Sequence, residues 1–455
     1  DKRYKSALSR LCRYCSDHNI APDQVSDQVI AGFMTYVHTQ TFARKPNDVH
    51  RRATRVWNDA VDLIPGWPQA RLHVPDFRKP RMSSPIEAFP TSFQKDVESY
   101  LAWLSGLDLF TEHAPPNVCK PRTIVQRRMQ ITLMASALLR QGWQLNEIRL
   151  LEDLVTADAV KAILTDYLNR TNKKASTFVH GLAKTLIHIA RHWIRVDHEQ
   201  LETLKELRSR LGPERTGITE KNKTTLLQFD DGTNVLRLLN LPGDMIAETK
   251  KGKMSKAREA IFVQIAMAIS ILIHAPLRMQ NLVSLRLDSH LLRPGGKHGT
   301  VHIVIPESEA KGGEIIDYPL PEETLAILDL YLQAYRPAIC GEGSKWLFPG
   351  KGNGGKSQTT LSQQIKETIF KYTGLTMTPH QFRHLAAKLL LDHSPGNLEA
   401  ARQLLAHKSI KSTSTFYAEL QTPNAARHYD KLLQEKRQNL VEKKSEKGKK
   451  NDQIP

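Results

Sequence analysis

Five residues of this chain are of the types needed to break a phosphodiester bond without a metal ion. They are the arginines Arg278 and Arg383, the histidines His380 and His407, and the tyrosine Tyr417. Arginine can neutralise the charge of a five-coordinate phosphate, imidazole can move protons, and a phenol can act as the nucleophile. If these side chains converge in the folded chain, they could cleave and rejoin nucleic acid through a covalent phosphotyrosine.

The pair His380 and Arg383 is expected at the start of a helix. Thr378 and Pro379 before it are typical of an N-cap and a first helical residue. Residues three apart share a helix face, and a helix N-terminus favours an anion. A solvated basic helix start would have the same pattern, so this pair alone does not establish a site. His384 could suggest a metal pair with His380, but the intervening glutamate of a metalloprotease is missing and no metal is expected.

The other members also have ordinary explanations when each is taken alone. Arg278 follows a Pro-Leu step after an apolar helix, so its buried charge needs a carboxylate or a substrate anion. Lys311 lies beside two glycines in a predicted hairpin turn, where it could be a solvent-exposed lysine or a proton donor to a leaving alkoxide. His407 could cap a helix, and Tyr417 could be a half-buried aromatic.

The composition indicates a polyanionic partner. The 455 residues hold 65 Lys+Arg against 47 Asp+Glu, a net charge of +18 and a pI near 9.6. This length suggests two to four domains, and 40% apolar residues are typical of a globular chain. Cys12 and Cys15 form a C-x2-C pair without the second pair of a zinc site, so buried thiols in a reducing compartment are expected.

The elements predicted by periodicity give a mainly α chain with a small β-sheet. The expected order is helical N-terminal domains followed by an α+β domain. The apolar run 261–273 is predicted to be a buried helix rather than a membrane span, and no secretory signal is visible, so a cytoplasmic, DNA-associated protein is expected. The expected parts are an N-terminal helical domain 1–82, a linker with one helix 83–119, a helical domain 120–215, a linker 216–257, a catalytic domain 258–430, and a helix end with a basic disordered tail 431–455.

The order and spacing of these residues carry more weight than any one of them. The segment 258–430 resembles the catalytic domain of the tyrosine recombinase (phage-type integrase) family. That family has an arginine after a buried helix, a hairpin lysine, His-x-x-Arg, a Gly-His step and a nearby tyrosine. The residues that match in that order are Arg278, Lys311, His380, Arg383, His407 and Tyr417. The segment 120–215 is similar to the family's helical core-binding domain.

The resemblance implies site-specific recombination of duplex DNA through a 3′-phosphotyrosyl intermediate, without metal, ATP or any other cofactor. It also implies a homotetramer on two synapsed duplexes, with accessory DNA-bending or directionality proteins as possible partners and no membrane. Lysines and arginines of the helical domains would contact phosphates. The candidates are Arg44, Lys45, Arg51, Arg52 and Arg55 in the first domain, and Lys120, Arg122, Arg127, Arg128, Lys173 and Lys174 in the second.

Three positions depart from the family pattern. Ala406 stands where glycine is usual, and we expect it to be tolerated. Asn281 replaces a frequent glutamate, so the support of Arg278 is expected to differ. The interval between His407 and Tyr417 is one residue longer than usual, which makes Tyr372 and Tyr429 the competitors for the nucleophile; their distance and context favour Tyr417.

Three other functions fit the same sequence. A type IB topoisomerase uses similar chemistry to relax DNA, and relaxation without sequence preference would distinguish it from a recombinase. A DNA-binding protein with a decayed active site is the second alternative, and suitable residues at all six catalytic positions argue against it. An RNA-binding protein would share the charge, and it would prefer single-stranded RNA over duplex DNA.

Overall fold

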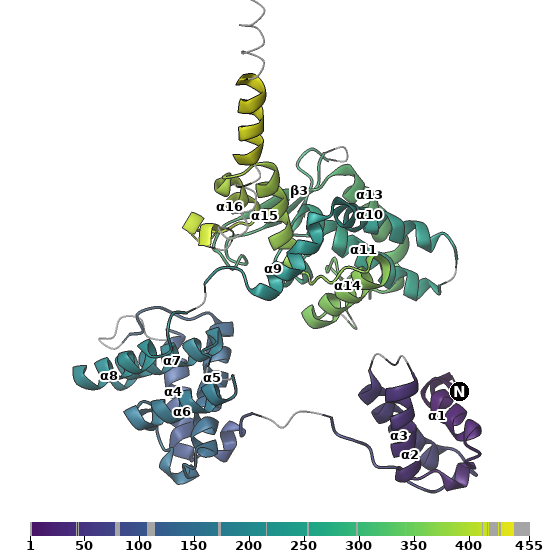
Figure 1. The fold of residues 1–455 in the computed structure, drawn as a ribbon, viewed down its shortest axis with the longest axis horizontal. Helices are drawn as coiled ribbons and strands as arrows, with labels where there is room; N and C mark the ends of the chain where they lie inside the picture. Colours follow the sequence, from purple (N-terminus) through teal and green to yellow (C-terminus); the bar gives the residue numbers. More distant parts are fainter. Residues whose placement is uncertain are drawn as a thin grey trace, which may run out of the picture. The chain divides into compact units, whose positions relative to one another are not determined.

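The structure, a computed structural model, divides into two compact units, Asp1–Glu214 and Arg215–Pro455. Figure 1 shows both units as mainly helical. The residues described are 2–440 except 42, 44, 78–81, 107–113, 172–173, 215, 253, 297–298, 342, 351, 353, 412, 416, 418–425 and 427–428.

The first unit begins with three helices around their own apolar core. They are α1 (Lys2–Asp17), α2 (Asp27–Gln40) and α3 (Pro46–Leu63). Their apolar residues recur at helical spacing and so lie on one face of each helix. Leu11, Phe33 and Trp57 on these faces pack into one cluster. The indole Nε1 of Trp57 donates to the Ala70 carbonyl at 2.8 Å and so ties the following segment to α3.

A second core in this unit includes a helix that sequence analysis placed in a linker. Within 83–119, helix α4 buries Phe93, Val97, Tyr100 and Leu104 completely or nearly so. The surrounding prolines suggested a linker, but the helical face of α4 packs into the core, and that part of the linker assignment is wrong. The five helices of this core are α4 (Thr91–Leu104), α5 (Pro121–Arg140), α6 (Ala157–Asn169), α7 (Thr177–His188) and α8 (His198–Ser209).

The second unit also absorbs a segment that sequence analysis took for a linker. Residues 216–257 contain two helices, and Leu238, Leu241 and Met245 of the second are buried in the main core. Pro242 lies inside that helix, and the helix continues past the Pro-Gly step. The helices of this unit are α9 (Glu220–Leu227), α10 (Gly232–Thr249), α11 (Lys256–His274), α12 (Met279–Val283), α13 (Glu322–Leu330), α14 (Gln358–Thr373), α15 (Gln381–His393) and α16 (Leu398–Leu404).

The predicted hairpin is confirmed and gains a third short strand. Strands β2 (His302–Ile305) and β3 (Ile316–Pro319) pair antiparallel, with Ile303 opposite Tyr318. The added strand, β1 (Leu291–Leu292), pairs with β2 and is too short to show a period of its own. The turn between β2 and β3 carries Lys311.

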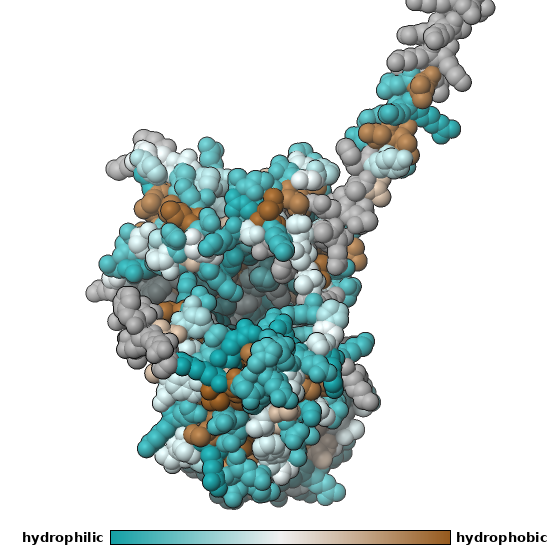
Figure 2. Space-filling view, turned by 90° about the vertical axis from the view of Figure 1, so that its left-hand side faces the viewer, coloured by the Kyte–Doolittle hydropathy of each residue, from teal (hydrophilic) through white to brown (hydrophobic). Residues whose placement is uncertain are grey.

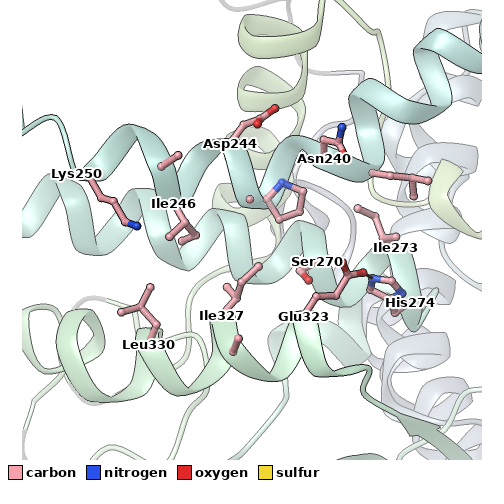
Figure 3. Close-up of a pocket in the computed structure, with 15 residues that line it drawn as sticks. Asn240, Asp244, Ile246, Lys250, Ser270, Ile273, His274, Glu323, Ile327 and Leu330 are labelled. Atoms are coloured by element: carbon pink, nitrogen blue, oxygen red, sulfur yellow. Dashed lines mark ion pairs between the residues drawn. The ribbon is translucent and has the colours of Figure 1, made fainter.

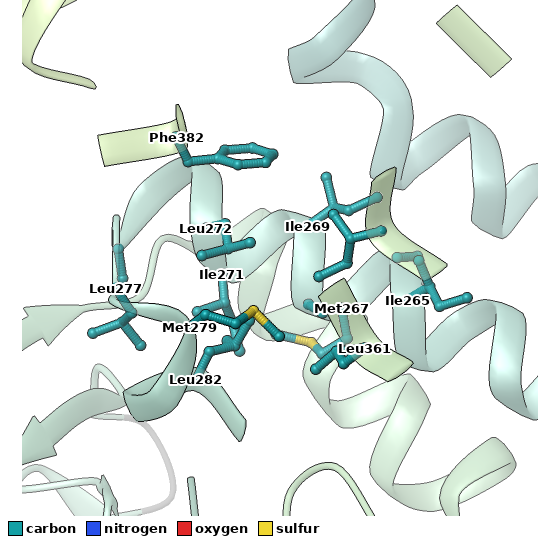
Figure 4. Packing of buried hydrophobic residues seen from close by; sticks show 14 of the residues in the cluster. Ile265, Met267, Ile269, Ile271, Leu272, Leu277, Met279, Leu282, Leu361 and Phe382 are labelled. Atoms are coloured by element: carbon teal, nitrogen blue, oxygen red, sulfur yellow. The ribbon is translucent and has the colours of Figure 1, made fainter. Parts of the chain in front are cut away.

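Helix α11 is the centre of the second unit. Almost all of its residues from Ala260 to Leu272 are buried, as expected for the apolar run. Figure 4 shows Leu272 and Ile271 packed near Leu277, Leu282 and Phe382, which belong to the segment after α11, to α12 and to α15. The same core therefore fixes the elements that carry Arg278 and Arg383.

By length and composition α11 could cross a membrane, and among the described residues no other helix passes that test. Its most apolar window is 61% buried inside the protein, which is the pattern of a core helix. Figure 2 shows a face on which hydrophilic residues predominate and apolar atoms form separate small patches. The helical residues 429–440 near the C-terminus expose Leu432, Leu433 and Leu440.

The separate cores predict that a cavity in one unit leaves the other folded. Leu138 is fully buried in the core of α4–α8, so Leu138→Ala should cost about 2–5 kcal/mol there. Hydrogen exchange followed by mass spectrometry should show lost protection in 91–209 and unchanged protection in 256–393. The control Val125→Ala, at a 67% exposed position, should change the free energy of unfolding by less than about 0.5 kcal/mol. Equal loss of protection in both units would contradict separate cores.

Candidate active site

Arg383 lies in the first turn of α15 and its side chain is only 3% exposed. Its Nη1 donates to the Pro276 carbonyl at 2.7 Å, and its Nη2 donates to the Leu405 carbonyl at 2.6 Å. One guanidinium thus joins the chain just before Arg278 to the chain just before His407. Residues more than 100 positions apart are brought together by this side chain.

Arg278 is the N-cap residue of α12 and enters the same region half-buried. Its Nη1 is buried and has no hydrogen-bond partner among the residues that the structure describes. Within the described part of the chain, neither Arg278 nor Arg383 forms an ion pair with a carboxylate. The substitute for the usual glutamate, Asn281, is buried, and its Nδ2 also has no partner. The charge of Arg278 is left for an anion to neutralise.

The two arginines perturb each other. Burial, and then the charge of Arg278, lower the pKa of Arg383 to about 10. Burial also lowers the pKa of Arg278, while Tyr318 opposes that shift. Two guanidinium groups close enough to repel are costly without a counter-ion. This cost would be relieved by a bound phosphate.

Tyr318 on β3 is a site residue that sequence analysis missed. Its hydroxyl donates to the Leu404 carbonyl, and both arginines act on its pKa, which burial raises. It therefore links the sheet to the end of α16, beside the two guanidinium groups. The alternation of buried Ile316 and Tyr318 along β3 was a signal for its inward position.

His407 follows a strained residue at the end of α16. Ala406 has φ +44°, in the left-handed region that favours glycine, which accounts for the glycine usual in the family. The structure accommodates alanine there, as expected, but with strain. The His407 Nδ1 lies 3.0 Å from Thr413 Oγ1, and Arg402 donates to the His407 carbonyl at 2.8 Å. Burial, and then Arg383 and Arg278, lower the pKa of His407 to about 4.

Lys311 approaches this region through the glycines that follow it. A Cβ built on Gly312 would lie 3.3 Å from the Ala406 carbonyl oxygen, and Gly313 has φ +67°. The turn therefore needs small residues to pass close to the backbone next to His407. The Lys311 side chain is exposed, and its charge contributes to the lowered pKa of His380. The structure brings the hairpin lysine to the other cations.

His380 lies in the turn before α15 and is open to solvent. The start of that helix is closed by a capping interaction in which the Thr378 N–H donates to Gln381 Oε1 at 2.7 Å. Thr378 was expected to be the N-cap residue, but the N-cap of α15 is His380 and the regular helix begins at Gln381. Desolvation, and then the charges of Arg383, Arg278 and Lys311, lower the pKa of His380. A neutral imidazole can accept a proton.

Tyr417 is 1% exposed, and its ring packs against Ala387, Leu391 and Leu405. Its hydroxyl lies 3.2 Å from the Nδ1 of His384. Burial raises the pKa of the phenol, and the charge of Arg383 opposes that shift. The longer interval after His407 therefore still brings this tyrosine to the cluster.

The competing tyrosines have different surroundings. Tyr429 is 62% exposed on the C-terminal helical residues. Tyr372, on α14, is 39% exposed and lies against Phe262 and Lys371. Among the described residues, no hydrogen bond or ring contact joins either tyrosine to the arginines or histidines of the cluster. Tyr372 does accept a hydrogen bond from the Lys371 amine at 3.3 Å, but this lysine is not part of the cluster.

Most candidate DNA-contacting cations are exposed, and some are engaged within the protein. Lys45, Arg55, Lys120, Arg122 and Lys174 are exposed. Four of the cations have partners within the protein. Arg51 pairs with Asp48, and Arg128 pairs with Glu98. Arg52 donates to Ser6, and Arg127 donates to Thr185 and Gln130. Arg44 and Lys173 lie outside the described residues. Arg127 has mainly an internal role in this structure.

A cavity of about 530 Å³ lies away from these residues, between α10, α11 and α13. Figure 3 shows His274 and Glu323 facing each other at its side, with His274 Nε2 2.7 Å from Glu323 Oε1. Asp244 and Lys250 line other parts of it. None of the six predicted catalytic residues lines this cavity.

A second cavity, of about 840 Å³, lies beside a glycine-containing turn. Residues 350–357 have the G-x-x-x-x-G-K-S spacing of a phosphate-binding loop. However, Pro349 and Gly355 pair as an antiparallel bridge, and the Lys356 amine bonds to the fully buried Gln264. Burial lowers the pKa of Lys356 to about 8. Its amine is held inside the fold and does not reach toward a ligand as such loops require.

Comparison with known proteins shows which proteins the chain is similar to. Residues 244–423 match the model of the phage integrase family. The tyrosine recombinase XerC of Pseudomonas aeruginosa is 25% identical over 282 residues, which is 61% of this chain and 84% of that protein. The tyrosine recombinase XerD of Proteus mirabilis is 28% identical over 151 residues, 32% of this chain and 45% of that protein. A solved Tn1549 transposon integrase in complex with transposon right end DNA has a TM-score of 0.41 and 16% identity, over 69% of this chain and 95% of that one.

The strain at Ala406 predicts that glycine stabilises the second unit. A Cβ in the left-handed region costs about 1–2 kcal/mol, and the flexibility of glycine in the unfolded chain offsets about 0.5–1 kcal/mol. Ala406→Gly should therefore raise the free energy of unfolding by about 0.5–1 kcal/mol, measured by urea denaturation. The control Ala401→Gly, inside α16, should lower it by at least about 1 kcal/mol, because this buried alanine also loses a packed methyl group. A destabilised Ala406→Gly variant would show that φ is relaxed in solution.

The uncompensated charge predicts that sulfate binds more tightly at lower pH. His407 has a pKa of about 4 beside two arginines, so a bound anion should raise that pKa toward its usual 6.5. Binding then takes up a proton between these pH values, and affinity rises as pH falls, by at most about tenfold per pH unit for one proton. Sulfate titrations followed by thermal unfolding should show this in the full chain. His407→Gln should weaken the pH dependence; an unchanged dependence would assign it to another group.

Proposed function

We propose a reaction for this chain, which belongs through residues 244–423 to the phage integrase family and is a tyrosine-type site-specific recombinase. It cleaves and rejoins duplex DNA through a 3′-phosphotyrosyl intermediate, with neither metal nor ATP. The phosphodiester energy is retained in the covalent bond, so religation needs no further energy source. This proposal applies to the second unit the roles that the resemblance implies.

One observation carries the proposal. Arg278 and Arg383 lie together without a carboxylate among the described residues, and the Tyr417 phenol feels the charge of Arg383. A structural salt bridge would have placed an acidic side chain here. An uncompensated guanidinium pair next to a phenol is what attack on a phosphate requires.

In the proposed cleavage step, the Tyr417 oxygen attacks the scissile phosphorus while His380 accepts the phenol proton. The bond between phosphorus and the 5′-oxygen breaks, and Lys311 gives a proton to that departing oxygen. Arg278 and Arg383 neutralise the non-bridging oxygens, and His407 hydrogen-bonds the same phosphate. The reverse sequence, with a 5′-hydroxyl as the nucleophile, joins the strands.

The energetics explain why so many cations are needed. An ordinary tyrosine has a pKa near 10, and burial raises that of Tyr417 further. Each well-placed donor to the transition-state phosphate is typically worth about 3–4 kcal/mol, or about 10²–10³ in rate. The two arginines together can therefore offset the cost of forming the phenolate.

The proposed substrate is double-stranded DNA carrying specific recombination sites, bound by a homotetramer. Exposed lysines and arginines of the first unit, such as Lys120 and Arg122, would contact its phosphates. The exposed leucines Leu432 and Leu433 would bury against a neighbouring protomer. Accessory DNA-bending or directionality proteins would act on the same complex.

The proposal predicts a covalent adduct that depends on one tyrosine. The full chain, incubated with nicked duplexes whose sequence is randomised around the nick, should give a DNA–protein adduct that survives denaturing electrophoresis. Tyr417→Phe should abolish it because phenylalanine has no nucleophilic oxygen. Tyr372→Phe and Tyr429→Phe, at exposed positions, are matched controls that should keep it.

The pattern of adducts separates the remaining possibilities. No adduct from the unaltered chain, under conditions in which it binds the duplexes, would favour a DNA-binding protein with an inactive site. An adduct that survives Tyr417→Phe and is lost in Tyr372→Phe or Tyr429→Phe would move the nucleophile to that tyrosine. Sequencing of the trapped DNA would also identify the preferred site.

A further inference from the structure

His384 is a buried histidine with no part in the reaction described above. It follows Arg383 on α15 and is 3% exposed. Its Nδ1 lies 3.2 Å from the hydroxyl of Tyr417, the atom that would attack the phosphate. Either atom could donate this hydrogen bond, and the two possibilities have opposite chemical meanings. If the phenol donates, His384 can be a base; if Nδ1 donates, His384 stabilises a phenolate.

The other ring nitrogen of His384, Nε2, distinguishes the two possibilities. It belongs to a series of hydrogen bonds whose first donor is known. The backbone N–H of Thr378 can only donate, and it lies 2.7 Å from one side-chain atom of Gln381. The Thr378 hydroxyl lies 3.0 Å from the same atom. That atom must be the amide oxygen Oε1, since the amide nitrogen would face another donor. The Nε2 of Gln381 therefore points the other way.

The next hydrogen bond in this series runs from Gln381 to Asn222, which lies on α9. The Gln381 Nε2 donates to Asn222 Oδ1 at 3.1 Å. The Asn222 Nδ2 then faces His384 Nε2 at 3.4 Å. An amide nitrogen is a donor only, so His384 Nε2 must accept and carries no hydrogen. A neutral imidazole with a bare Nε2 has its proton on Nδ1.

A 180° flip of the Asn222 or Gln381 side-chain amide does not change the tautomer inferred for His384. A flipped Asn222 would place its Nδ2 against the Gln381 Nε2, so that two donors face each other. Flipping Gln381 as well would place its Nε2 against the Thr378 backbone N–H. The backbone donor therefore determines the orientation of both amides.

The surroundings keep the ring neutral. Burial, and then the neighbouring His380, Arg383 and His407, lower the pKa of His384 to about 4. The His380 ring lies 5.0 Å away between centroids, and the Tyr417 ring lies 6.0 Å away. At neutral pH, His384 thus has one ring proton, and the hydrogen-bond chain places that proton on Nδ1.

We propose that His384 is a further catalytic residue that donates its Nδ1–H to the Tyr417 oxygen and stabilises the phenolate as it forms. Asn222 and Gln381 are positioning residues that set the tautomer of His384. The inference rests on the proposed function of Tyr417. His384 neither gains nor loses a proton in the step; the phenol proton goes elsewhere, as described above. A hydrogen bond to a charged partner is worth about 1.5–3 kcal/mol, or about 10–10² in the rate of phenolate-dependent attack.

The tautomer can be measured without DNA. In the full chain labelled with ¹⁵N-histidine, long-range ¹H–¹⁵N correlations distinguish a protonated Nδ1 from a protonated Nε2, and His384→Asn identifies the signal. We expect Nδ1–H in the unaltered chain and in Tyr417→Phe. Asn222→Ala should populate Nε2–H, while Asn234→Ala, whose amide donates to Gln228 outside the chain of bonds, should not. Nε2–H in the unaltered chain overturns the proposal, and an Asn222→Ala variant that keeps Nδ1–H overturns the role of Asn222.

The rate of adduct formation tests the chemical role. His384→Asn keeps an N–H donor near the position of Nδ1 but cannot act as a base, whereas His384→Leu has neither property. In correctly folded variants, checked by thermal unfolding, Asn should retain activity within about tenfold and Leu should lose about 10–10². Equal loss in both would make His384 a base, and no loss in either would make it structural; each result overturns the proposal. Absence of any adduct from the unaltered chain would instead refute the proposed function, and the tautomer would still be readable.

Discussion

The buried guanidinium of Arg383 is the interaction on which the rest of the site depends. Its two hydrogen bonds to the Pro276 and Leu405 carbonyls join three segments that are far apart in sequence. A guanidinium is planar with several fixed donors, so it can hold two backbone segments at once and still present charge to a third group. A lysine could not do this with the same geometry. The contacts made by Arg383 thus serve both the fold and the chemistry.

This arrangement lowers the stability of the fold when no phosphate is bound. Two arginines that pair with no acidic side chain among the described residues, an alanine at positive φ and a buried tyrosine all oppose stability. The apolar core around α11 compensates for them, because it positions α12 and α15 through many contacts that do not involve the site. A bound phosphate would relieve the repulsion. Such conflicts between stability and local structure are typical of functional sites.

The polar groups behind the site have a different task. Thr378, Gln381 and Asn222 do not contact the arginines, yet they form a directional series of hydrogen bonds that ends at the tyrosine. The capping interaction of α15 starts this series. A local feature of helix formation is in this way coupled to the protonation state of a group in the site. The segment that contains α9, taken for a linker from its sequence, supplies an essential member.

The sequence by itself determined the mainly helical character of the chain, its hairpin and the candidate residues for phosphate chemistry. The apolar run 261–273 predicted a buried helix, the strand pattern predicted the hairpin, and the order of Arg278, His380, Arg383 and Tyr417 indicated the chemistry. Only the tertiary structure decided that α4 and α10 are core helices, since a proline or glycine signal says nothing about what packs on the other side. The sequence contained no signal for Tyr318 as a site residue, and it suggested His384 only as a metal ligand, which was set aside. Their roles come from contacts between segments distant in sequence, and spacing along the chain does not encode such contacts.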